Sequence, residues 1–170
     1  QTRSGANSVL YRVSSRSFPN RQVVLTRNAL AVVPRPGYES DSSKNPYIAY
    51  NALRLTGNWA IASNGSQTDS IAEKIESNLP VRDSLIASLL ELDYEKDAYS
   101  TPRIAAIVSL RGRTGWFGII RKDALIVREV PLEPGRVSYL ATYEADDIRD
   151  DQSSEFDASN ADQAARFIID

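Results

Sequence analysis

The sequence of 170 residues contains no cysteine, no histidine and no methionine. Without cysteine, the chain has no disulfide bond, no thiolate nucleophile and no thiolate ligand for a metal. Without histidine, it lacks the side chain that most often acts as a general base near neutral pH. Any proton transfer must therefore fall to Glu, Asp, Lys, Tyr or a polarised water molecule.

Long apolar runs and a strong excess of one charge are also missing. No apolar run approaches the roughly 18 to 20 residues that a membrane-spanning helix needs, and no secretory leader is recognisable. The formal net charge of −2 argues against binding nucleic acid through a broad basic surface. We therefore expect a cytoplasmic protein that binds neither a membrane nor a nucleic acid.

The length and composition predict a single domain over residues 1–170, large enough for its own hydrophobic core. Apolar residues make up 42% of the chain and charged residues 25%, which is close to the average for globular proteins. We expect strands over residues 8–13, 23–25, 29–33, 47–56, 59–63, 104–110, 115–120, 125–130 and 137–143. We expect helices over residues 69–77, 80–90 and 160–169, and a loop over the acidic stretch 146–157. Because the helices are grouped rather than alternating with strands, the sequence predicts an α+β fold with helices covering antiparallel sheets.

The segment 11–21 mixes guanidinium groups with short hydroxyl side chains. The arginines are Arg12, Arg16 and Arg21, and the serines are Ser14, Ser15 and Ser17. Arginine forks and hydroxyl groups together can hold a phosphate. The other interpretation is the end of a strand with solvated arginines.

A second candidate anion site lies at the start of the helix expected over residues 69–77. Asn64, Gly65 and Ser66 precede that helix, where free backbone N–H groups and the helix dipole favour a negative charge. Ordinary helix capping explains the same residues.

The densest cluster of titratable groups is Asp93-Tyr-Glu-Lys-Asp97. In a cleft, Lys96 flanked by acids could hold one carboxylate ionised and present an ammonium group to a substrate oxygen. On a surface, the same residues are a solvated charge cluster. Nearby aromatic and amide side chains lie on the strand expected over 47–56. There Tyr47 and Asn51 would share one face and Tyr50 would take the other, either as ligand contacts or as sheet packing.

Several longer motifs, in order along the chain, resemble one known family. They are Tyr11-Arg-Val-Ser-Ser-Arg-Ser-Phe-Pro-Asn-Arg21, Lys44-Asn-Pro-Tyr-Ile-Ala-Tyr-Asn51, Ser63-Asn-Gly-Ser66, Asp93-Tyr-Glu-Lys-Asp97, Thr101-Pro-Arg-Ile104 and Tyr139-Leu-Ala-Thr-Tyr-Glu144. Together they resemble the archaeal-type IMP cyclohydrolase family. The chain departs from that pattern at Gln67, where the family has a histidine, and at Ala52, where it often has a cysteine.

The resemblance implies an activity and a fold. The activity is the last step of de novo purine biosynthesis, in which 5-formamidoimidazole-4-carboxamide ribonucleotide closes to inosine monophosphate (IMP) with loss of water. The fold is a four-layered αββα sandwich like that of the N-terminal-nucleophile hydrolases, without their autoprocessing. Purine ribonucleotides are the expected partners, together with further copies of the chain in a homo-oligomer. No cofactor and no metal are expected.

The reaction that the resemblance implies suggests roles for individual residues. Glu95 is the candidate for orienting or deprotonating the amide, and Lys96, Arg21 or Tyr50 for polarising and protonating the departing oxygen. The remaining candidates are expected to bind the substrate: Arg12, Ser14, Ser15, Arg16, Tyr47, Asn51, Asn64, Gly65, Ser66 and Arg103.

Two other functions stay open at this point. One is a purine-nucleotide-binding homologue that has lost turnover, which the departure at Gln67 suggests. The other is a different amide hydrolase on the same fold, although Gln1 is not a nucleophile.

Overall fold

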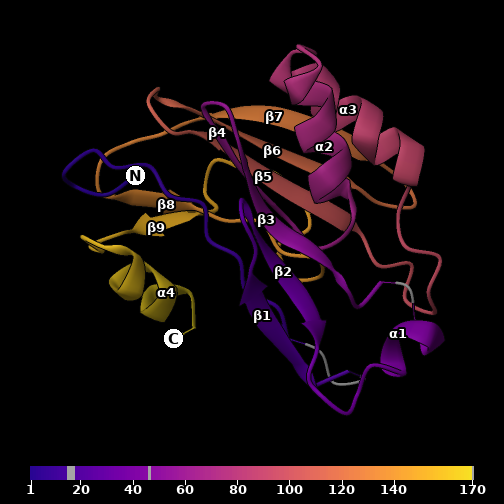
Figure 1. Cartoon of the computed structure of the whole chain (residues 1–170). Coiled ribbons are helices and arrows are strands. Elements are labelled where there is room, and N and C mark those ends of the chain that lie inside the picture. Colours follow the sequence, from indigo (N-terminus) through magenta and orange to yellow (C-terminus); the bar gives the residue numbers. More distant parts are fainter. Residues whose placement is uncertain (15–17, 46, 170) are drawn as a thin grey trace.

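The computed structural model describes residues 1–14, 18–45 and 47–169 and is dominated by one antiparallel sheet (Figure 1). Its seven strands pair in chain order, each antiparallel to the next. They are β1 (Arg21–Leu25), β2 (Ala29–Pro34), β3 (Tyr50–Thr56), β4 (Trp59–Ser63), β5 (Arg103–Ser109), β6 (Thr114–Ile120) and β7 (Leu125–Pro131). A large antiparallel sheet combined with helices confirms the predicted α+β class.

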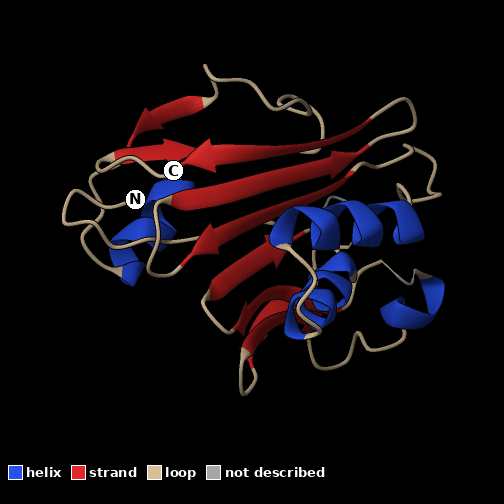
Figure 2. Cartoon of the chain, turned by 90° about the horizontal axis from the view of Figure 1, so that it is seen from above, coloured by secondary structure: helices blue, strands red, loops and turns tan. Residues whose placement is uncertain are grey.

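Two helices, α2 (Gln67–Glu76) and α3 (Val81–Leu92), cover one face of this sheet (Figure 2). Pro80 precedes α3, where its fixed φ angle and missing N–H suit a helix start. Asp93 ends the helix with φ 56°, which turns the chain away from the helix axis. A short helix, α1 (Asp41–Lys44), precedes β3.

The main hydrophobic core lies between these helices and the sheet. Its buried members are Ile61, Ile71, Ala72, Leu85, Ala105 and Ile107. Fully burying one large aliphatic side chain contributes about 1.5 to 3 kcal/mol. Gly118 of β6 allows α3 to approach closely, because a Cβ there would lie 2.8 Å from Leu89 Cδ1 and 3.1 Å from Leu85 Cδ2. Close packing of α3 fixes where the chain leaves it at Asp93.

The C-terminal part forms a small second unit away from α2 and α3 (Figure 1). Strands β8 (Arg136–Ser138) and β9 (Ser153–Glu155) pair antiparallel, and α4 (Ala161–Ile169) follows. Phe156, Ala158 and Ala164 form its buried cluster, against which Leu10 packs. None of the helices within the described ranges is long and apolar enough to span a bilayer.

Four details of the predicted secondary structure are wrong. Residues 8–13 form no strand, and Leu10 among them packs against the C-terminal cluster of Phe156, Ala158 and Ala164. The strand expected over 47–56 begins only at Tyr50, and the one expected over 137–143 is limited to β8. The acidic stretch expected as a loop contains β9.

Candidate active site

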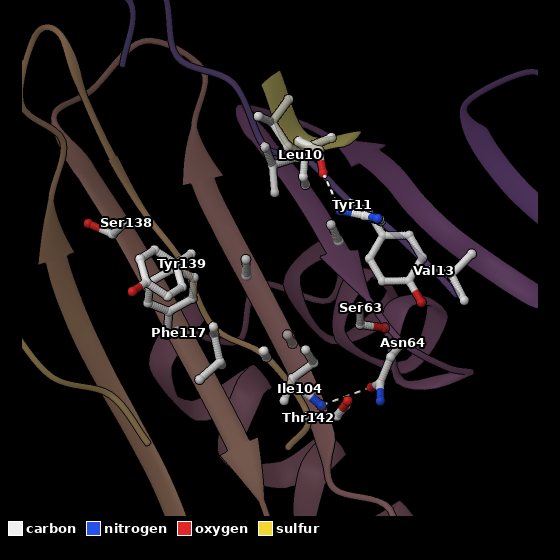
Figure 3. Close-up of a pocket in the computed structure, with 18 of the residues that line it drawn as sticks. Leu10, Tyr11, Val13, Ser63, Asn64, Ile104, Phe117, Ser138, Tyr139 and Thr142 are labelled. Carbon is white, nitrogen blue, oxygen red and sulfur yellow. Dashed lines mark hydrogen bonds between the residues drawn. The ribbon is translucent and has the colours of Figure 1, made fainter. Parts of the chain in front are cut away.

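A cavity of about 1540 Å³ lies over the face of the large sheet that α2 and α3 leave open. Ile104 and Ala106 of β5 point into it, because alternate residues of a strand face opposite sides and Ala105 and Ile107 belong to the core. The N-terminal segment 8–14, strand β8, residues 139–143 and α4 form the other walls. Figure 3 shows Tyr11, Ser63 and Asn64 on one side and Phe117 and Tyr139 on the other. The cavity exceeds the roughly 300 to 1,000 Å³ of typical small-ligand pockets.

Two tyrosines meet at the cavity wall. The Tyr11 and Tyr50 hydroxyl oxygens lie 2.7 Å apart, a hydrogen-bond distance between the N-terminal segment and the first residue of β3. Burial raises the pKa of both phenols, and for Tyr11 the neighbouring Tyr50 adds to the rise. Both hydroxyls therefore remain protonated at neutral pH.

Arg21, the first residue of β1, places a guanidinium beside this pair. Its Nε donates to the Phe18 carbonyl at 3.2 Å, which orients the side chain. The positive charge of Arg21, after the larger effects of burial and of Tyr11, lowers the Tyr50 pKa. A fixed positive charge thus stands next to the two phenols.

Glu95 provides the acidic group of the same wall. It is only 7% exposed, and burial raises the pKa of its carboxyl to about 7, against the opposing charge of Arg103. Asp97 raises this pKa further, whereas Arg21 lowers it. A carboxyl that titrates near neutral pH can both accept and return a proton.

The loop after α3 is tied so that Glu95 turns inward. The Glu95 N–H donates to the Thr101 carbonyl at 2.9 Å. Asp97 accepts hydrogen bonds from the Thr101 backbone N–H at 2.9 Å and from the Thr101 hydroxyl at 2.7 Å. The Thr101 hydroxyl lies 3.0 Å from that of Tyr143, which joins this loop to the segment across the cavity.

Arg103 supports Glu95 from behind the wall. Its Nη1 lies 3.7 Å from the Glu95 carboxylate and donates to Gln67 Oε1 at 3.0 Å, while its Nε donates to the Asp93 carbonyl at 2.8 Å. Gln67 is fully buried and donates to Asn64 Oδ1 and to the Ile104 carbonyl. These contacts hold the Glu95 carboxyl in place, and neither Arg103 nor Gln67 lines the cavity.

No metal centre accompanies these groups in the described ranges. Among those residues, no cluster of three or more acidic side chains could hold a metal ion. Around Tyr50 the cavity lining includes the Tyr11 phenol, the Arg21 guanidinium and the Glu95 carboxyl with its raised pKa.

Comparison with known proteins identifies the family. A model of the IMP cyclohydrolase-like protein family matches residues 1–170. The chain belongs to this family. The resemblance noted in the sequence motifs is thereby confirmed.

Individual relatives in the IMP cyclohydrolase-like family match most or all of the chain. The IMP cyclohydrolase of Methanococcus aeolicus is 43% identical over 171 residues, covering 100% of this chain and 83% of the relative. That of Haloquadratum walsbyi is 50% identical over 142 residues, covering 84% and 68%. That of Methanosphaera stadtmanae is 42% identical over 159 residues, covering 94% and 76%.

The structure brings about half of the candidate residues for this family's chemistry to the cavity. Those that line it are Arg12, Ser14, Arg21, Tyr47, Tyr50, Asn64 and Glu95. Ser15 and Arg16 lie outside the described residues. The amide of Asn64 is engaged in the wall, because Oδ1 accepts from the Ile104 N–H and Nδ2 donates to the Pro102 carbonyl, each at 2.8 Å.

Lys96 does not reach the cavity, contrary to the expectation for a catalytic lysine. Its ammonium group pairs with the Asp93 carboxylate and lies 3.3 Å from the centre of the Tyr94 ring. Successive residues of the loop point in different directions, so the turn that buries Glu95 leaves Lys96 exposed.

Asn51, Gly65, Ser66 and Arg103 also lie away from the cavity lining. Asn51 donates to both oxygens of Asp69 at 3.0 Å, on the α2 side of the sheet. Since β3 begins at Tyr50, Tyr47 precedes the strand and lines the cavity together with Tyr50, so the predicted sharing of faces is wrong.

The expected anion site at the start of α2 also takes a different form. Ser66 is exposed, and its side chain forms no capping hydrogen bond. A Cβ on Gly65 would lie 2.5 Å from Arg103 Nη1. This turn therefore packs against the arginine that supports Glu95.

Sequence reasoning missed Tyr11, Asp97, Thr101 and Tyr143 as individual site residues. Each belongs to one of the recognised motifs, so the signal was present. What the sequence does not reveal is that a phenol at position 11 meets one at position 50.

Proposed function

We propose that this chain is an IMP cyclohydrolase and that ring closure takes place beside Tyr50, Arg21 and Glu95. The observation that carries the proposal is the placement of Glu95, a buried carboxyl with a pKa of about 7, on the same cavity wall as the Tyr50 phenol and the Arg21 guanidinium. The substrate is 5-formamidoimidazole-4-carboxamide ribonucleotide, and the products are IMP and water.

The reaction needs a base and a stabilised oxygen. The carboxamide nitrogen attacks the formyl carbon, a C–N bond forms, and the formyl oxygen takes up a proton to become a hydroxyl group. A second proton releases this hydroxyl as water, and the formamide nitrogen loses its own proton as the ring C=N bond forms. The amide is a poor nucleophile, so removal of its proton must accompany the attack. Because both reacting groups belong to one molecule, holding them in contact supplies much of the acceleration.

The residues at the wall divide these tasks. In its ionised form, Glu95 accepts the amide proton. The positively charged guanidinium of Arg21 stabilises negative charge on the formyl oxygen. Tyr50, whose phenol is protonated, donates a proton to the departing oxygen. Glu95 passes the amide proton to the formyl oxygen, which becomes the hydroxyl group, and the formamide N–H proton returns through water to the Tyr50 phenolate. Both residues therefore end each turnover in their starting state.

We expect the phosphate of the ribonucleotide to bind at the more exposed end of the cavity. Arg12 and Ser14 line the cavity and are exposed, and an arginine fork beside a hydroxyl group suits a phosphate. Among the described residues, the Arg12 side chain donates from Nη1 to the Ile168 carbonyl at 3.3 Å, and a guanidinium has further N–H donors for a ligand.

The finer fold assignment and the assembly belong to this proposal as well. In a four-layered αββα arrangement, α2 and α3 supply one helical layer and the seven-stranded sheet the next. Strands β8 and β9 supply the second sheet, and α4 accompanies them. A homo-oligomer in the cytoplasm is the expected form.

The experiment is to incubate the purified protein with the formylated ribonucleotide and to measure IMP by chromatography. The proposal predicts IMP formation well above the rate without protein. A folded protein that binds the nucleotide tightly, but forms IMP no faster than buffer, is the nucleotide-binding homologue instead.

A further inference from the structure

Gln67, the first residue of α2, is completely buried. Its Nε2 atom donates to Asn64 Oδ1 at 2.8 Å and to the Ile104 carbonyl at 3.1 Å. Its Oε1 atom accepts from Arg103 Nη1 at 3.0 Å. A side-chain amide has two N–H donors, so both donors of Gln67 are engaged. The proposed steps of the reaction give this residue no part.

The orientation of this amide is fixed by groups that can act in one way only. The Ile104 N–H donates to Asn64 Oδ1 at 2.8 Å (Figure 3), and Asn64 Nδ2 donates to the Pro102 carbonyl at 2.8 Å. The Asn64 oxygen and the Ile104 carbonyl are therefore the two acceptors beside Gln67. A guanidinium, in contrast, only donates hydrogen bonds. Gln67 must therefore turn Nε2 toward the two acceptors and Oε1 toward Arg103.

The Arg103 guanidinium lies between Gln67 and Glu95. Its Nη1 atom is 3.0 Å from Gln67 Oε1 but 3.7 Å from Glu95 Oε1, so only the first contact is a hydrogen bond. Arg103 Nε donates to the Asp93 carbonyl at 2.8 Å, and the guanidinium carbon lies 5.4 Å from the centre of the Tyr47 ring. A small rotation toward Glu95 would make a direct ion pair, and the bond to Gln67 opposes that rotation.

A direct hydrogen bond from Arg103 would weaken Glu95 as a base. Such a bond favours the ionised carboxylate over the protonated form, and water screens it little because both side chains are almost completely buried. Burial raises the pKa of Glu95 to about 7 despite the charge of Arg103, which agrees with a guanidinium held at a distance. Glu95 also faces other charged or titratable groups, which a change at position 67 leaves in place: Arg21, Asp97, Tyr11 and Tyr50.

We propose that Gln67 is a positioning residue that holds the Arg103 guanidinium away from Glu95 and so leaves this carboxylate free to accept the amide proton. This inference rests on the proposed function and adds a residue to it. Gln67 does not line the cavity and acts only through Arg103.

The test compares Gln67→Met with Gln67→Glu. Methionine is unbranched like glutamine and fills a similar space, but it gives Arg103 no oxygen acceptor. Arg103 should then pair with Glu95, whose carboxyl should titrate about one pH unit or more below the wild type. Glutamate keeps the acceptor and adds a negative charge, so in Gln67→Glu this titration should stay at the wild-type pH or rise. Carbon NMR of the Glu95 carboxyl, assigned from Glu95→Gln, measures both titrations without turnover.

The rate of IMP formation gives a second readout. In Gln67→Met, kcat should fall by roughly 10- to 100-fold, because a charge-assisted hydrogen bond to Glu95 must weaken before the carboxylate takes a proton. KM should change by less than about threefold. The matched control is Gln152→Met, at another buried glutamine, which lies outside the cavity lining and accepts from the Arg149 N–H at 3.1 Å. It should leave the Glu95 titration and kcat unchanged.

The outcomes separate the inference from the function it rests on. Absence of IMP formation by the wild-type protein contradicts the proposed function, while the NMR titrations still test the position of Arg103. An unchanged or higher Glu95 titration in Gln67→Met overturns the role of Gln67, and so does a fall of the same size in Gln67→Glu. If Gln67→Met fails to fold, Gln67→Glu decides alone, since a Glu95 titration below that of the wild type in this variant contradicts the proposal.

Discussion

The Arg103 Nη1 atom lies 3.7 Å from the Glu95 carboxylate, and both side chains are almost completely buried. This separation exceeds a direct hydrogen bond, so the arginine neutralises the carboxylate only in part. The carboxyl consequently keeps a raised pKa of about 7 rather than the lowered value of a tight ion pair.

The raised pKa of Glu95 predicts how stability depends on pH. The folded protein holds this proton up to about pH 7, whereas the ordinary value is 4.5. Protonated Glu95 therefore contributes fully to the free energy of unfolding below pH 4.5. This contribution is lost as the pH rises to about 7. Relative to the wild type, Glu95→Gln should gain at most roughly 3 kcal/mol across this window.

Urea unfolding at about pH 5 and about pH 8 measures this change. The control is Glu91→Gln, at an exposed glutamate whose pKa is lowered by its hydrogen bond with Lys74. Its stability difference from the wild type should be nearly the same at both pH values, because a pKa below 4.5 leaves this glutamate ionised at about pH 5 and at about pH 8. A difference between Glu95→Gln and the wild type that is the same at both pH values would contradict a raised pKa.

Replacing Lys96 should hardly affect the reaction. Its ammonium group pairs with Asp93 outside the cavity, so Lys96→Ala should change kcat by less than about threefold. The comparison is Arg21→Ala, which removes the guanidinium beside Tyr50 and should lower kcat by about 100-fold. Equal losses of kcat in the two variants would indicate that Lys96 takes part in the reaction.

The phosphate site is tested through Arg12. A charge-assisted contact with phosphate is worth about 1.5 to 3 kcal/mol, so Arg12→Ala should weaken binding of IMP roughly 10- to 100-fold. Binding of the nucleoside inosine should stay the same, as calorimetry of both ligands would show. Arg82→Ala, at an exposed arginine on α3, is the control, and equal loss for the two ligands would show that Arg12 does not contact the phosphate.

Neighbouring positions at the start of α2 should respond differently. In Gly65→Ala the added Cβ would lie 2.5 Å from Arg103 Nη1 and 2.7 Å from Gln67 Oε1, and such crowding costs about 1 to 3 kcal/mol. Ser66→Ala removes a hydroxyl that caps nothing and should alter the free energy of unfolding by less than about 0.5 kcal/mol. A larger loss in Ser66→Ala would indicate that capping, rather than packing around Arg103, matters at this turn.

The sequence predicted the parts of the fold that depend on local pattern. Strands β5 to β7 were expected close to their observed bounds because apolar and β-branched residues run between clear turn residues there. Residues 8–13 have a similar pattern, but a strand also needs a neighbour to pair with, which the local sequence does not reveal.

The candidate site was predictable in its residue types and only partly in its geometry. The motif around Glu95 was recognised, but which of Glu95 and Lys96 faces the cavity depends on the turn that Asp97 and Thr101 hold closed. The burial of Arg103 depends on Gln67, 36 residues away in the chain. Such contacts arise only when α2 and the Glu95 loop pack together.

The most direct test of the account is the rate of IMP formation by Glu95→Gln beside that of the wild type. Glutamine keeps the shape and a hydrogen-bonding group but cannot accept the amide proton. The account predicts that the wild type forms IMP, that kcat falls by about 10²- to 10⁴-fold in the variant, and that affinity for IMP stays within a few-fold. A folded Glu95→Gln variant that forms IMP at the wild-type rate would contradict the central role of this carboxyl.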